Sequence, residues 1–244
     1  MSVWDLARQC AALAAVSAVL FTAPYSWAKD QKNDRVIRWN EANPECTLTA
    51  ADGMHRYSIE YETLKLTLAV DDNELKKSTR TAEHVFSVLV TANNRGKEAI
   101  KIVPPNMKLE LVSHHRALMR AQYPDELSHR LQDDSDELIY QSEKTLKKHP
   151  EEKDTVEYRL KAHEELVSQW QAFLSTQSLR ETSVDSGRPE VTGWVFFKTN
   201  TKWLGNWKDQ EEFVLRIPVG KRVFEFPFKL PMDNRPTLRQ RDQP

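Results

Sequence analysis

The chain has 244 residues, of which 39% are hydrophobic and 29% are charged, and its 35 basic residues nearly balance its 36 acidic ones. This length is sufficient to bury a hydrophobic core, whereas the formal net charge of -1 provides no long-range attraction to nucleic acid or to an anionic membrane surface. We therefore expect neither as a partner.

Residues 1–28 have the features of a secretory signal peptide. An apolar run from Ala11 to about Ala23 follows a weakly cationic start, and Ser26 and Ala28 are small residues at the third and first positions before a cleavage site. The run is shorter than the roughly 20 residues of a comfortable bilayer span. We predict cleavage after Ala28, a periplasmic or secreted protein, and no stable membrane span after cleavage. The alternative is an uncleaved membrane anchor.

Cleavage would leave Cys46 as the single cysteine of the mature chain. One thiol cannot form an internal disulfide, so we expect the mature fold to be stable without one. No motif of a reactive nucleophile surrounds Cys46. We interpret it as a buried or unreactive thiol, with pairing between two chains as the alternative.

The first half of the chain alternates between apolar and polar residues, which is typical of half-buried strands. Leu64, Leu66 and Leu68 fall on one side of a strand, with Lys65 and Thr67 on the other. This pattern predicts four strands, at 57–70, 84–92, 99–103 and 107–112.

The periodicity becomes helical in the middle of the chain, where no glycine occurs between roughly His114 and Arg180. One stripe has the spacing of a single helix face, and it comprises Val156, Leu160, His163, Val167, Trp170 and Leu174. Asp154 and Glu157 fit the spacing of a capping box at the start of this helix.

An earlier helix is predicted to begin after Pro124 and to use Leu127, Leu131 and Leu138. The acidic stretch 133–137 is a candidate interruption of that helix. His149-Pro150 separates the two helices, so we expect a helical hairpin.

Alternation returns in the last third and predicts strands at 191–199, 212–218 and 222–230. Trp194 and Phe196 face one way in the first of these, and we expect Trp194 to belong to the core. The polar, proline-containing tail 231–244 is predicted to be disordered.

About seven short strands predict a mainly β protein, an immunoglobulin-like antiparallel β-sandwich within residues 29–230. A helical hairpin at about 114–180 is inserted between the fourth and fifth strands. A hairpin returns to its origin, as an insertion between two neighbouring strands requires. Whether the hairpin packs on the sandwich is left open by the sequence.

Two segments resemble known domains. The stretch VFSVLVTANNRGKEAIKIVPPNMKLELV, a strand followed by an N-x-G-K turn and an extended run, is similar to the early strands of telokin-like immunoglobulin-fold domains of secreted bacterial proteins. VTGWVFFKTN resembles a later strand of these domains. The resemblance implies an extracytoplasmic binding or structural module and no catalytic residues.

Motifs of catalysis and of metal binding are absent from the sequence. The histidine pair His114-His115 and the nearby His129 do not form an HExxH motif, and no glycine-rich phosphate loop or GxSxG is present. We therefore predict no catalytic residues, no metal site and no cofactor. We interpret His163 as a partly buried histidine whose nitrogens are hydrogen-bonded.

The candidate binding residues lie in TKWLGNWKD, a predicted turn between two strands. Trp203 and Trp207 would stack on a sugar or peptide if their rings are exposed, and Lys202 and Lys208 lie just outside them. The alternative is that the indoles line the turn and cover the core. The remaining candidate surface is the hairpin, whose first helix has an interrupted apolar stripe.

These features favour a non-enzymatic binding module that recognises a protein, an envelope component or a glycan. One alternative is an envelope metal-binding protein or hydrolase, in which His114, His115 and His129 would converge with an acid such as Glu126. Another is a structural assembly subunit in which exposed strand edges pair with neighbours.

Overall fold

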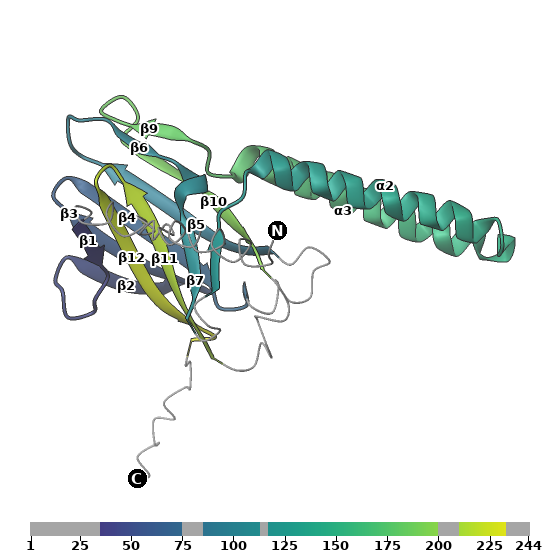
Figure 1. The fold of residues 1–244 in the computed structure, drawn as a ribbon, viewed down its shortest axis with the longest axis horizontal. Helices are drawn as coiled ribbons and strands as arrows, with labels where there is room; N and C mark the ends of the chain where they lie inside the picture. Colours follow the sequence, from purple (N-terminus) through teal and green to yellow (C-terminus); the bar gives the residue numbers. More distant parts are fainter. Residues whose placement is uncertain (1–34, 75–84, 113–116, 200–209, 233–244) are drawn as a thin grey trace, which may run out of the picture. The chain divides into compact units, whose positions relative to one another are not determined.

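The computed structural model describes residues 35–74, 85–112, 117–199 and 210–232, all of which belong to one unit, Arg35–Pro244. Within these ranges the chain is mainly β and forms two five-stranded sheets, one two-stranded sheet and two long helices (Figure 1). The prediction of a mainly β fold with two helices is therefore confirmed.

One five-stranded sheet, sheet I, has the strand order β1-β12-β11-β7-β8. Its strands are β1 (Arg35–Arg38), β7 (Lys108–Leu111), β8 (Ala117–Arg120), β11 (Glu211–Val219) and β12 (Arg222–Leu230). β1 runs parallel to β12, and the other neighbours are antiparallel.

The other five-stranded sheet, sheet II, is antiparallel throughout and has the order β10-β5-β4-β3-β2. Its strands are β2 (Cys46–Ala51), β3 (Met54–Tyr61), β4 (Leu64–Asp71), β5 (Val85–Asn94) and β10 (Glu190–Lys198). The short pair β6 (Ile100–Ile102) and β9 (Thr182–Val184) forms the third sheet, and the 3-10 turn η2 (Pro104–Asn106) leads into β7.

The two large sheets share one hydrophobic core, in a sandwich-like arrangement. Alternate residues of the central strands point into it, including Phe86 and Val88 of β5 and Leu215 of β11. Phe213 stacks on Phe86 and on Phe228, with ring centroids 5.0 Å and 5.2 Å apart. Cys46 is buried at the margin of this core as a free thiol.

The predicted strand 57–70 is wrong, because the structure divides this segment into β3 and β4. The chain turns at Glu62, which has a left-handed φ of 55°. Turns of this kind are normally marked by glycine or asparagine, and neither is present here. Leu64, Leu66 and Leu68 do share the buried side of β4.

Strands β1, β2, β8 and β9 were not predicted. The signal for the β2–β3 hairpin was present in Asp52-Gly53, whose φ angles of 56° and 72° are those of a tight hairpin turn. β8 lies inside the range assigned to the helical insertion, so the helical part begins later than 114. The tail from 233 lies outside the described residues.

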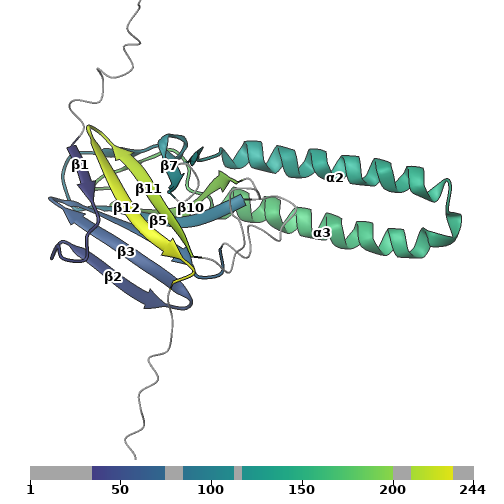
Figure 2. The same cartoon turned by 60° about the horizontal axis from the view of Figure 1, so that its bottom comes forward.

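The helical hairpin consists of α2 (Pro124–Leu146) and α3 (Lys153–Gln177), joined through the 3-10 turn η3 (Pro150–Glu152). Figure 2 shows the two helices side by side. The acidic stretch 133–137 does not interrupt α2. The predicted capping box is wrong, because α3 begins at Lys153 and no side chain caps it.

Among the residues placed in the structure, no helix combines the length and the apolar composition that would allow it to cross a membrane.

Candidate binding surface

The structure does not describe the turn that the sequence proposed as a binding site. Lys202, Trp203, Trp207 and Lys208 lie outside the described residues, as does the predicted cleavage site at Ala28. Their roles therefore stay predictions.

The alternative of a metal site required His114, His115, His129 and Glu126 to converge, and the structure describes only two of these four residues. His129 and Glu126 are both exposed on α2, and His114 and His115 lie outside the described residues. In the described ranges no three His, Cys, Asp or Glu side chains come close enough together to hold a metal ion.

The base of the hairpin packs on the outer face of sheet II. Val85 of β5 and Phe196 of β10 are buried there against Leu127 of α2 and Leu174 of α3. Phe173 of α3 meets Phe196 edge to face, with ring centroids 6.3 Å apart. The sequence left the packing of the hairpin open, and the structure shows that its base is attached to the sheet.

Trp194 lies in this outer cluster, next to Phe173, and not in the shared core. It is half-buried. The prediction that Trp194 belongs to the core is therefore wrong in location, because its alternation with Val195 places it on the face that the hairpin covers.

The chain on either side of the hairpin is fixed to the edge of β10 by backbone hydrogen bonds. Gln122 N donates to the Phe196 carbonyl and Leu179 N donates to the Trp194 carbonyl, each at 2.8 Å. Gly193 permits this close approach, since a Cβ at this position would lie 2.5 Å from Leu179 N and 2.6 Å from Leu179 Cα. Both ends of the insertion are thus attached to one strand.

A bidentate ion pair joins the start of α2 to the chain just after the end of α3. Arg180 donates from Nη2 to Asp125 Oδ1 at 2.8 Å and from Nη1 to Asp125 Oδ2 at 3.1 Å. This hydrogen bonding from Arg180 lowers the pKa of Asp125, an exposed side chain. Because the pair is exposed, solvent and salt weaken it.

The interface between the helices is only partly apolar. Serine recurs every seven residues on α2, at Ser128, Ser135 and Ser142, and none of the three is exposed. Gln171 of α3 donates to Gln132 of α2 across the pair at 3.1 Å. These short or polar residues leave little hydrophobic area between the helices.

His163 of α3 belongs to this interface. Its Nε2 atom is buried and has no hydrogen-bond partner among the residues that the structure describes. The prediction that its nitrogens are satisfied is therefore not met at Nε2.

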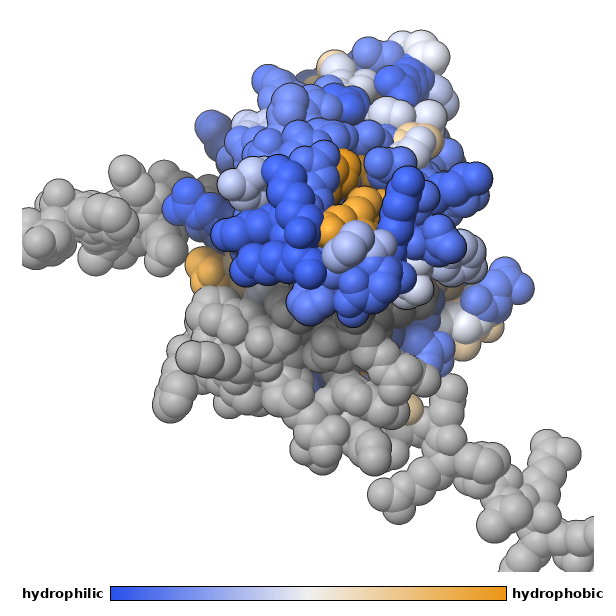
Figure 3. Space-filling view, turned by 90° about the vertical axis from the view of Figure 1, so that its right-hand side faces the viewer, coloured by the Kyte–Doolittle hydropathy of each residue, from blue (hydrophilic) through white to orange (hydrophobic). Residues whose placement is uncertain are grey.

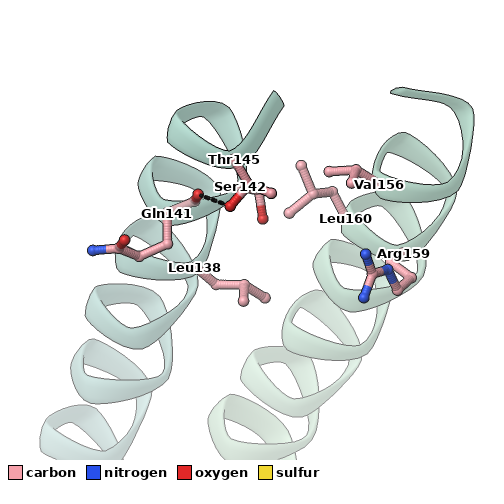
Figure 4. A pocket seen from close by; sticks show the side chains of 7 residues that line it. All are labelled: Leu138, Gln141, Ser142, Thr145, Val156, Arg159 and Leu160. Atoms are coloured by element: carbon pink, nitrogen blue, oxygen red, sulfur yellow. Dashed lines mark hydrogen bonds between the residues drawn. The ribbon is translucent and has the colours of Figure 1, made fainter. Parts of the chain in front are cut away.

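The helices leave a hollow of about 400 Å³ between them, near the connecting turn. Its lining consists of Leu138, Gln141, Ser142, Thr145, Val156, Arg159 and Leu160. Figure 4 shows Leu138 and Leu160 pointing toward one another from opposite helices, with Arg159 on the α3 side. In Figure 3, hydrophobic surface lies exposed among hydrophilic residues on this side of the molecule. The hollow exists because Ser142 and Thr145 are too short to fill it.

One side of the hairpin carries most of its large apolar residues between the base and this hollow, and we call it the apolar side. Its residues are Leu127, Leu131 and Leu138 of α2 and Leu166, Trp170 and Phe173 of α3, spaced three, four or seven apart and so on one face of each helix. The members nearest the sheet are covered by β10 and β5. Leu138 and Leu166 remain 42% and 52% exposed.

Two aromatic residues on other faces of the helices are also exposed. Tyr140 and Tyr158 have exposed fractions of 61% and 77%. Tyr140 lies two residues from Leu138 and Tyr158 two residues from Leu160, and at about 100° per residue this spacing points both side chains away from the hollow. They provide natural controls for the hollow.

The hairpin also carries the excess negative charge of the described structure. Residues 124–177 contain 13 acidic and seven basic side chains. In the described residues outside the hairpin, the two kinds are equal in number. One of the acids, Asp134, shares the face of Leu131 and Leu138, three and four residues away, and Glu137 lies next to Leu138 at the border of that face.

Two further clusters of ionisable residues belong to the sheets. On sheet I, Arg216 lies 2.5 Å from Glu110 and 2.8 Å from Glu225, and Arg38 lies 3.3 Å from Glu225. Burial opposes the charge on Arg216, but hydrogen bonds to Glu225 and Glu110 outweigh it and raise the pKa of the guanidinium. Such cross-strand pairs stabilise strand register.

The other cluster lies on sheet II. Burial, assisted by the negative charge of Asp72, raises the pKa of Tyr57 to about 12. The Tyr57 hydroxyl donates to Met232 Sδ at 3.3 Å. His55 Nε2 lies 2.6 Å from Asp72 Oδ1, although the geometry is not that of a hydrogen bond. A tyrosine held neutral in this way fits a packing role.

Comparisons with protein-family models, curated proteins and solved structures find no match to this chain. The candidate surface is therefore defined by geometry alone. The sequence pointed to the hairpin through its interrupted apolar stripe, but it did not reveal which side the sheet covers. That depends on the contact with β10, whose Phe196 is 69 residues away from Leu127 of α2.

Proposed function

We propose that the protein is a periplasmic or secreted, non-enzymatic binding module that presents its helical hairpin to a protein partner. The observation that carries this proposal is the apolar side of the hairpin. It leaves Leu138 and Leu166 about half exposed and ends in a hollow lined by both helices. Exposed apolar patches bordered by polar residues are typical of protein interaction sites.

Strand order supports an immunoglobulin-like sandwich as the scaffold. In that fold strands A, B and E share one sheet, and C, F and G share the other. β4, β5 and β10 are adjacent in sheet II, and β7, β11 and β12 are adjacent in sheet I, which fits the same two groups. The hairpin then occupies the place of strand D, while β1, β2 and β3 are additions before the first shared strand.

An extracytoplasmic location is part of the proposal and depends on residues 1–28. Cleavage after Ala28 removes the apolar run between Ala11 and Ala23. The intact mass of the exported protein tests this: we expect the mass of a chain that begins at Lys29. A mass that includes residues 1–28 would contradict secretion by this route and would favour an anchor.

Site-specific photocrosslinking in the native host tests the binding function. A photoreactive benzoylphenylalanine at position 138 or 166 should form the same covalent adduct with one partner protein. The matched controls carry the same group at positions 140 and 158, where exposure is greater but the side chains point away from the hollow. No adduct at 138 and 166, or equal adducts at all four positions, would contradict the proposed function.

A further inference from the structure

We infer that the partner on the apolar side is a cationic amphipathic helix that lies along α2 and α3 as the third helix of a bundle. This inference rests on the proposed function, because it names the partner chemistry for the same surface.

The shape of the apolar side fits a helix. Two helices packed side by side present a groove, here bordered by Leu131 and Leu138 on α2 and by Leu166 and Trp170 on α3. A helix that docks in such a groove inserts apolar residues at spacings of about three, four and seven. One apolar residue of the docked helix would fill the hollow between Leu138 and Leu160. Another would pack on the exposed side chain of Leu166.

The charges near the groove set the chemistry of the partner. Asp134 lies seven residues from Gln141 of the hollow, which corresponds to roughly 10 Å along a helix. A partner whose apolar anchor fills the hollow therefore carries its residues two turns away past Asp134 and Glu137. Lys or Arg at those positions would pair with the carboxylates, and like charges there would be repelled.

Among the described residues, no basic side chain forms an ion pair with Asp134 or Glu137. Arg130 donates to Gln122 Oε1 instead, and Arg159 lies at the hollow on the α3 side. Glu137 accepts a hydrogen bond from Gln141 at 2.6 Å, which leaves its negative charge in place. The acidic border of α2 is thus available to a cationic partner.

A second copy of the hairpin is a poorer occupant. In a two-fold interface each surface meets its own equivalent. Both hairpins would bring 13 acidic and seven basic side chains, so that like charges would oppose the association. The charge balance favours a partner of opposite sign.

Three synthetic peptides test the inference with the exported protein. The first is a Leu/Lys helix with leucines along one face, the second replaces each Lys by Glu, and the third is a scrambled Leu/Lys sequence without an apolar face. Binding is measured by fluorescence anisotropy of the labelled peptides at low and at physiological salt. We expect the amphipathic Leu/Lys helix to bind at least about tenfold more tightly than the other two, a difference well above measurement error.

Variants then locate the site. The pair Leu138→Gln/Leu166→Gln should weaken binding of the Leu/Lys helix about tenfold or more, whereas the control pair Tyr140→Ser/Tyr158→Ser should leave it unchanged. Asp134→Asn/Glu137→Gln should weaken binding and reduce its salt dependence. Ser142→Leu should fill the hollow and weaken binding without lowering the melting temperature, which separates docking from damage to the fold.

The outcomes distinguish the inference from the proposed function. If the Leu/Glu helix binds equally well and depends equally on Leu138 and Leu166, the cationic partner is wrong and the docking surface stands. If no peptide binds, or if the Leu138/Leu166 variant binds normally, the inference is overturned. A concentration-dependent dimer that Leu138→Gln/Leu166→Gln dissociates would overturn it in favour of a second copy. Failure of the photocrosslinking at 138 and 166 would contradict the function itself.

Discussion

The two sheets and the outer half of the hairpin bury their side chains to different extents. Between the sheets, Phe86, Phe213 and Phe228 stack in a core of large apolar residues. Between α2 and α3, by contrast, Ser135 and Ser142 lie where leucines would fill the space, and a hollow remains. Helices in proteins gain most of their stability from such packing.

This difference separates the part of the chain that stabilises the fold from the part that we propose as a docking surface. The sheets contain enough buried apolar surface to hold the fold, and they hold the base of the hairpin through Phe196 and Val85. The outer hairpin contributes little to that core and leaves its own apolar side incomplete. We interpret it as the part of the chain that a partner completes.

Truncation within the shared core should have the largest effect on stability. Phe213→Ala removes a ring that is 1% exposed and stacks on two others. The expected loss is about 3–5 kcal/mol in the free energy of unfolding, from lost burial and the cavity left behind. Denaturant unfolding of the whole chain measures it. A loss below about 1 kcal/mol would mean that the sheets are not the stable part.

The junction between sheet and hairpin should be nearly as sensitive at Gly193. Gly193→Ala forces the backbone at Leu179 to move, and we expect a loss of about 1–3 kcal/mol, as for other overpacked sites. The matched control is Gly187→Ala, whose added methyl would meet only the Asp185 side chain, at 3.3 Å. Equal losses in the two variants would show that the hairpin is not held tightly against β10.

Changes inside the hairpin should affect the helices more than the sheets. Val167→Ala removes buried methyl groups from the helix interface, at an expected local loss of about 1–2 kcal/mol. Helical circular dichroism should melt earlier, while the Phe213 core unfolds at its usual temperature. The neighbouring exposed residue supplies the control, Leu166→Ala. If the sheets lose as much stability as the helices, the hairpin belongs to the main cooperative unit.

The smallest effect is expected at the Asp125–Arg180 pair. The pKa of Asp125 is lowered in the folded protein, so its stabilising contribution is present above the pKa of the unfolded carboxyl and is lost as pH falls through the folded pKa. Helix melting of Asp125→Asn should therefore differ slightly from the parent near neutral pH and should converge with it in acid or high salt. A difference that persists in acid would exclude the ion pair as its cause.

Much of the fold could be predicted because strand alternation is a local property. The buried sides of β4, β5, β11 and β12 and the stripe of α3 follow directly from their periodicity. The β3–β4 turn could not be predicted, since Glu62 takes a conformation that its residue type rarely adopts.

The candidate binding surface was less accessible to sequence reasoning than the strands. The sequence drew attention to Trp203 and Trp207, which lie outside the described residues. It also assigned Trp194 to the core, although the helix stripe and the strand pattern were both correct. Which faces of α3 and β10 meet is a long-range property that no local pattern contains. The contact between Phe173 and Phe196 shows which part of the hairpin the sheet covers. Leu138 and Leu166 lie beyond that part and remain exposed.

Native-state amide hydrogen exchange tests most directly whether this chain leaves the outer hairpin incompletely packed. The amides around Phe86 and Leu215 should exchange only through global unfolding, whereas those around Ser142 and Leu160 should exchange through local openings of much lower free energy. Protection should rise along both helices toward Leu127 and Leu174, where the sheet covers them. Uniform protection throughout the hairpin, equal to that of the strands, would contradict the account.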